Sequence, residues 1–75
     1  MTVTVKAIAG PDPLGFTYLL GEIAGAPAVS QVRAISNAAL AAGTVTVAAE
    51  AAALRADVDA AYVNWQAAQA ALAEL

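Results

Sequence analysis

A continuous heptad pattern in the C-terminal part of the chain constrains its fold more than any other feature. Between residues 47 and 75, apolar side chains recur at alternating intervals of four and three residues. This spacing keeps one stripe of an α-helix facing a partner helix. In that register the a positions are 51, 58, 65 and 72, and the remaining seam positions are d. The seam consists of Val47, Ala51, Leu54, Val58, Ala61, Trp65, Ala68, Leu72 and Leu75.

The rest of the chain offers this helix no obvious partner of matching length. The protein has 75 residues, a size at which a single hydrophobic core is only marginally stable. Hydrophobic residues make up 61% of the sequence, but much of that is alanine, and there are only one Phe, two Tyr and one Trp. No cysteine is present to form a disulfide. We therefore expect a single domain that gains stability by oligomerisation.

The sparse charge of the chain excludes several classes of partner. Lys6, Arg33 and Arg55 face six acidic residues, for a net charge of −3. Three scattered cations cannot neutralise a run of phosphates, so we expect no nucleic-acid partner and no membrane partner. The N-terminus lacks the basic segment and continuous apolar core of a signal peptide. These features favour a cytoplasmic location.

The first segment, residues 1–21, has the alternation of a half-buried strand or hairpin. Residues 10–15 are rich in glycine and proline and predict a turn, after which apolar and small residues alternate again. An exposed strand edge is a template for pairing with another chain. The candidate residues for such pairing with a partner strand are Thr2, Val3, Thr4 and Val5.

The middle segment, residues 22–43, predicts a loop followed by a short helix. From about residue 28, apolar residues fall at helical spacing, with Arg33 and Asn37 on the outer side and Gly43 placed to end the helix.

The last segment, residues 44–75, predicts the long helix, about 43 Å in length at 1.5 Å per residue. Residues 44–47 repeat the Thr-Val-Thr-Val of residues 2–5 and admit a third short strand. In the alternative, Thr46 caps the long helix and Glu50 lies in its first turn, where the helix dipole favours a negative charge.

The polar positions beside the seam predict how the helices associate. Glu50 and Arg55 occupy a g position and the following e position, where parallel coiled coils place an interchain ion pair. Trp65, flanked on the seam by Ala61 and Ala68, is too bulky for an ordinary dimer layer and favours a trimer or a larger bundle. In the alternative interpretation, Trp65 packs on the middle helix of its own chain.

The sequence carries no pattern typical of an enzyme. Without His or Cys there is no imidazole base, thiolate or soft metal ligand. Asp57 and Asp59 are two residues apart on a helix and do not face each other, which disfavours a carboxylate pair. We therefore expect no catalytic residue, no cofactor and no metal site.

The transition from a Thr/Val segment into an alanine-rich heptad helix, Gly-Thr-Val-Thr-Val-Ala-Ala-Glu-Ala-Ala-Ala-Leu-Arg-Ala-Asp-Val-Asp-Ala from residue 43, resembles the small accessory proteins of tailed-phage virions. These are head-fibre, decoration or cement proteins. The resemblance implies a virion location, as a trimer on a capsid, anchored by its N-terminal part and with the helices outward. It favours capsid stabilisation over host adhesion.

Together these patterns predict an α+β, mostly helical fold with an N-terminal hairpin, a short middle helix and a long heptad helix in an oligomeric, trimeric bundle. The expected function is a non-enzymatic structural component of a phage capsid, with itself and a larger protein assembly as partners. The alternative is a small adaptor whose C-terminal helix docks a different protein. A stable oligomer at micromolar concentration distinguishes the first hypothesis from the second.

Overall fold

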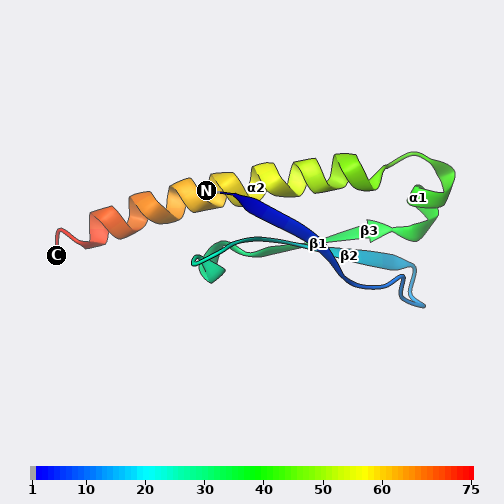
Figure 1. Ribbon diagram of the computed structural model, residues 1–75, viewed down its shortest axis with the longest axis horizontal. Coiled ribbons are helices and arrows are strands. Elements are labelled where there is room, and N and C mark those ends of the chain that lie inside the picture. The colour runs from blue at the N-terminus through cyan, green and yellow to red at the C-terminus, as the bar shows by residue number, and fades with distance from the viewer. Residues whose placement is uncertain (1) are drawn as a thin grey trace.

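The computed structural model describes residues 2–75 and shows an α+β fold in which one long helix lies on one face of a three-stranded sheet (Figure 1). The strands are β1 (Val3–Ala9), β2 (Phe16–Ile23) and β3 (Gln31–Ser36), in the order β1-β2-β3, and both neighbouring pairs are antiparallel. The helix is α2 (Val47–Leu72). The molecule measures 51 × 20 × 16 Å because α2 continues well past the sheet. Met1 of the expected first strand lies outside the described residues.

The expected N-terminal hairpin is confirmed. β1 and β2 pair in register from Val3 opposite Ile23 to Ala7 opposite Leu19, with a bulge just beyond. The turn between them is organised by Asp12, whose carboxylate accepts hydrogen bonds from the backbone N–H groups of Phe16 at 2.8 Å and Leu14 at 3.1 Å. An Asp that binds the backbone ahead of it fixes the turn locally.

The predicted middle helix is wrong over its first half. Residues of that segment form the 3₁₀ turn η1 (Pro27–Val29) and strand β3, and only α1 (Asn37–Ala42) is helical. Segment β3 pairs with β2 along its whole length, from Phe16 opposite Ser36 to Gly21 opposite Gln31. This non-local ladder satisfies the backbone groups that a helix would have bonded internally. Consequently Arg33 faces α2 instead of solvent.

Both ends of the connection between α1 and α2 match the sequence signals. Gly43 has a φ of 75°, and its N–H bonds back to the carbonyl oxygens of Ala39 and Leu40, which ends α1. Thr46 then caps α2: its Oγ1 accepts from the N–H of Ala49 at 3.1 Å, and Glu50 lies in the first turn. Residues 44–46 therefore lead into the helix, which starts at Val47, and they do not form a strand.

The core is a thin layer between α2 and the sheet. Leu54 and Val58 on α2 are 1% and 0% exposed, and they lie over Gly21 of the central strand β2. Burying two such side chains contributes about 2 kcal/mol each by apolar area. The other buried side chains come from the strands and the β2–β3 connection, and they are Val3, Leu19, Ile23, Ala26, Val29 and Ile35.

Candidate interaction surfaces

The predicted seam divides into a part that its own chain covers and a part that it does not. Leu54 and Val58 are fully buried against the sheet. Ala51, Ala61 and Trp65 are partly buried and pack against the same core. The remaining seam residues are exposed within one chain, and they are Val47, Ala68, Leu72 and Leu75.

Trp65 marks the boundary between these parts. Its side chain packs at the margin of the core of its own chain. Its ring centroid lies 5.9 Å from that of Tyr62, within the range for a favourable aromatic pair. Intrachain packing of Trp65 was the alternative left open by the sequence, although the surface it meets is the sheet-and-helix core and not a separate middle helix.

Beyond Trp65, no other described part of the chain buries α2. Every residue from 66 to 75 is exposed, and Figure 1 shows α2 running on past the η1 end of the sheet. Leu72 is 63% exposed and Leu75 is fully exposed. We call residues 66–75 the overhang. Its helical part, residues 66–72, is about 10 Å long, and Glu74 is its one charged side chain.

The charged residues beside the seam act within the chain. Nε of Arg33 donates to Oε2 of Glu50, and Nη1 of Arg33 lies 3.7 Å from Oδ2 of Asp57. Nε2 of Gln31 also donates to the backbone oxygen of Asp57 at 3.3 Å. These contacts hold α2 against β3. The carboxylate of Glu50, expected to meet an Arg55 from another chain, is thus engaged by Arg33, and Arg55 is exposed.

The expected partner strand lies at an edge of the sheet. β1 is paired only with β2, so its other side presents unpaired backbone groups. Within it, Val3 is buried and Val5 half-buried toward α2, whereas Thr4 is exposed and Thr2 precedes the strand. Lys6 sits in the middle of this strand, a placement that disfavours edge-to-edge pairing.

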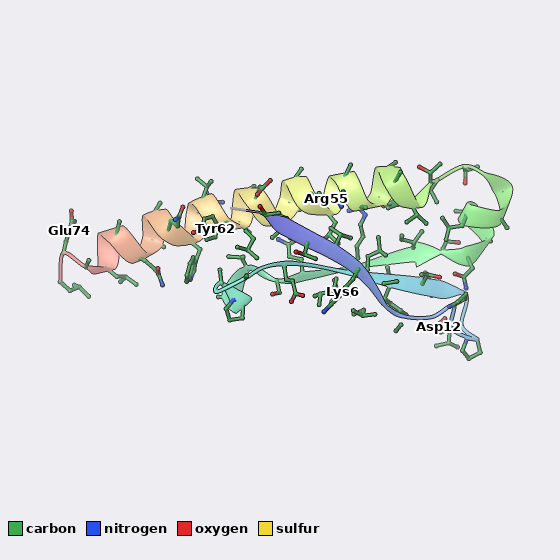
Figure 2. All side chains as sticks on the ribbon, viewed as in Figure 1. Lys6, Asp12, Arg55, Tyr62 and Glu74 are labelled. Carbon is green, nitrogen blue, oxygen red and sulfur yellow. The ribbon has the colours of Figure 1, made fainter. Side chains whose placement is uncertain are left out.

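The side of the sheet away from α2 is a second apolar surface, which the sequence analysis missed. Alternation along each strand places Leu20 beside Lys6 and Val32 on this side, and Figure 2 shows Lys6 pointing away from α2. Val32 is 59% exposed. We call this surface the outer face, and its members are Thr4, Lys6, Phe16, Tyr18, Leu20, Glu22, Val32 and Ala34.

Most of the outer face is apolar, and its two charged residues form an ion pair. Nζ of Lys6 lies 3.2 Å from Oε1 of Glu22, so its two charges neutralise each other. The rings of Phe16 and Tyr18 lie with centroids 6.4 Å apart. This surface does not exist if Val32 belongs to a helix, because Val32 then has no partner on β2. The signal for a strand in the sequence is the alternation of polar and apolar residues from 31 to 34.

Among residues 2–75 there is no pocket, no group of three or more acidic, His or Cys side chains that could hold a metal ion, and no buried polar side-chain atom without a hydrogen-bond partner. Over the same residues, no helix combines the length and apolarity needed to cross a bilayer.

The chain matches no protein-family model, and comparison with curated proteins and with solved structures finds no similar chain. The overhang and the outer face are therefore the surfaces from which we infer a function.

Proposed function

We propose that the protein is a non-enzymatic structural subunit that assembles with copies of itself through the overhang. The observation that carries this proposal is that Ala68, Leu72 and Leu75 form a row of exposed apolar residues, in a segment that extends past the hydrophobic core. Exposed leucines at Leu72 and Leu75 are stabilising only if another surface covers them. A charged or polar overhang would have argued for a solvated helix instead.

The total surface of the chain supports the same proposal. The accessible surface is 4726 Å² for a chain of 7.4 kDa, whereas a compact monomer of that mass exposes about 4,200 Å². The difference of about 500 Å² is a large part of the roughly 800 Å² that each partner buries in a standard interface. With so few charged side chains, 12% of the sequence, desolvating that surface costs little.

The resemblance of the segment from Gly43 onward to virion accessory proteins gives the setting that we propose, which is decoration or stabilisation of a phage capsid. The setting is tested by purifying virus particles from cells that carry the gene and analysing them by mass spectrometry. Peptides of this chain should band with the particles on a density gradient. Their recovery only from the soluble fraction would count against a capsid role.

Self-assembly is tested by sedimentation velocity of the purified chain at micromolar concentration. We expect the wild type to sediment as an oligomer, and the double variant Leu72→Gln, Leu75→Gln to sediment as a monomer. Two lost leucine contacts, at about 1.5 kcal/mol or more each, weaken association by at least about 100-fold. Leu14→Gln is the matched control, since Leu14 is 83% exposed but lies in the hairpin turn.

A wild-type chain that stays monomeric up to about 100 µM, a concentration at which contacts worth 5.5 kcal/mol would already register, contradicts self-assembly. That result would favour the adaptor alternative, in which the overhang docks a different protein.

A further inference from the structure

The overhang and the outer face are two largely apolar surfaces that the single chain leaves uncovered. Along the proximal half of α2, the helix has a sheet beneath it and the inner side of the sheet has a helix above it. The overhang is a helix without a sheet, and the outer face is a sheet without a helix. Each is mostly apolar, and each contains at most one charge that is not already paired.

We propose that two copies of the chain associate about a two-fold axis, so that the overhang of each copy covers the outer face of the other. This inference rests on the proposed self-assembly and specifies its geometry. The occupant of both surfaces is the same partner, a second copy. The closed arrangement leaves neither surface free.

The direction in which α2 leaves the sheet makes this arrangement possible. α2 lies on the inner side and passes beyond the sheet at its η1 end (Figure 1). A two-fold axis can lie in the plane of the sheet, just beyond that end and perpendicular to α2. It places a second sheet end to end with the first, with the outer face of the second sheet on the side where the first copy has α2. The overhang of the first copy then lies over the outer face of the second. The same operation places the second overhang over the outer face of the first.

The dimensions are compatible with that contact. The helical part of the overhang, residues 66–72, reaches about 10 Å, which is about three residues along a strand at about 3.3 Å each. Counted from the Gly21–Gln31 pair that ends the β2–β3 ladder, this reach covers the next cross-strand pair, Leu20 and Val32. Leu72 and Leu75 of one copy would therefore lie over Leu20 and Val32 of the other.

A parallel bundle of the overhangs alone would be held together by fewer contacts. Leu54 and Val58 are buried by their own sheet, so only Trp65 and the seam residues after it remain for a bundle. That is less than two heptads, whereas coiled coils are recognised by three or four sustained heptads. Such a bundle would also leave the outer face uncovered.

Cross-linking distinguishes the two geometries, because the chain has no cysteine of its own. The single variants Val32→Cys and Leu72→Cys are mixed and treated with a short bismaleimide. The two-fold arrangement predicts a cross-link between Val32→Cys and Leu72→Cys chains, and little linking of Leu72→Cys to itself. Leu14→Cys mixed with Leu72→Cys is the control and should not link. Efficient linking of Leu72→Cys to itself, without the mixed product, overturns the proposal in favour of a parallel bundle.

A charge swap provides a second test. Sedimentation velocity of Val32→Lys and of Leu72→Glu should each show a shift from dimer toward monomer. The double variant, which places a lysine opposite a glutamate at both contacts, should recover the dimer. An oligomer unaffected by Val32→Lys overturns the outer-face contact while leaving self-assembly intact. A wild-type mass above that of a dimer overturns the two-fold closure. A monomeric wild type contradicts the proposed self-assembly itself.

Discussion

Gly21 lies directly against Leu54, and a Cβ atom on Gly21 would stand 2.9 Å from the Cγ atom of Leu54 and 3.0 Å from the Cγ2 atom of Val58. Real Cβ atoms essentially never come within 3.0 Å of such a neighbouring atom, so Leu54 would have to shift. The glycine therefore sets how near α2 can come to the sheet. Because Leu54 and Val58 are the most deeply buried large side chains of the core, the packing of the whole layer depends on this position.

We predict that Gly21→Ala destabilises the protein. A glycine replaced by alanine without strain usually raises the free energy of unfolding by about 0.4–1 kcal/mol. Here overpacking should lower it by about 1–3 kcal/mol, so the net change is a loss. Urea denaturation measures it. Ala7→Val, which adds atoms at an exposed position of the edge strand β1, should cause no comparable loss. A Gly21→Ala variant as stable as the wild type would contradict the close approach.

The hairpin and the capped start of α2 could be predicted from sequence because their signals are local. Asp12 lies within the turn that it organises, and Thr46 lies three residues from the N–H that it caps. Strand β3 could not be predicted in this way. Val32 and Ile35 fit helical spacing as well as a strand, and the ladder with β2 that decides between the two is non-local.

The seam illustrates a second limit. A straight helix drifts by only about 20° per heptad from a 3.5-residue repeat, and an apolar stripe facing a core is at least about 100° wide. Over two heptads, a coiled-coil seam and a stripe that packs on a sheet have the same pattern. Leu54 and Val58 therefore satisfied the heptad rule while facing the sheet of their own chain.

The ion pair between Arg33 and Glu50 should be measurable as a coupling energy. A double-mutant cycle with Arg33→Gln and Glu50→Gln is expected to give about 0.5–1 kcal/mol, which decreases as salt is added. The same cycle between Glu50 and Arg55 should give a value near zero, since Glu50 is engaged by Arg33. A larger coupling to Arg55 would indicate the interchain pair of a parallel bundle instead. Urea denaturation at two salt concentrations provides both values.

The turn at Asp12 should make the stability depend on pH. The backbone N–H of Phe16, with smaller contributions from Tyr18 and other backbone N–H groups of the turn, holds the pKa of this carboxyl below its usual value of 3.8. A depressed pKa in the folded state means that the carboxylate stabilises the fold above about pH 4. That contribution is lost as the pH falls through the lower folded-state value.

Asp12→Asn isolates this effect. Its amide oxygen still accepts a hydrogen bond from Phe16 but does not titrate, so the variant should be less stable than the wild type at pH 6, and the difference should shrink below about pH 4. Thermal unfolding between pH 2 and pH 6 measures both curves. Parallel curves for the two proteins would show that Asp12 does not contribute to the acid sensitivity.

Truncation of two seam leucines should lower the stability with a different dependence on protein concentration. Leu54→Ala removes a side chain that is 1% exposed, and a cavity of that kind costs about 2–5 kcal/mol regardless of protein concentration. Leu72 is 63% exposed in the single chain, so Leu72→Ala should change the stability of the dilute monomer by less than about 0.5 kcal/mol. At high concentration its cost should grow, because association stabilises the folded state by mass action. Thermal unfolding over a 100-fold range of protein concentration separates these cases. A Leu72→Ala penalty that does not change with concentration would place Leu72 in an intrachain contact and remove the reason for assembly through the overhang.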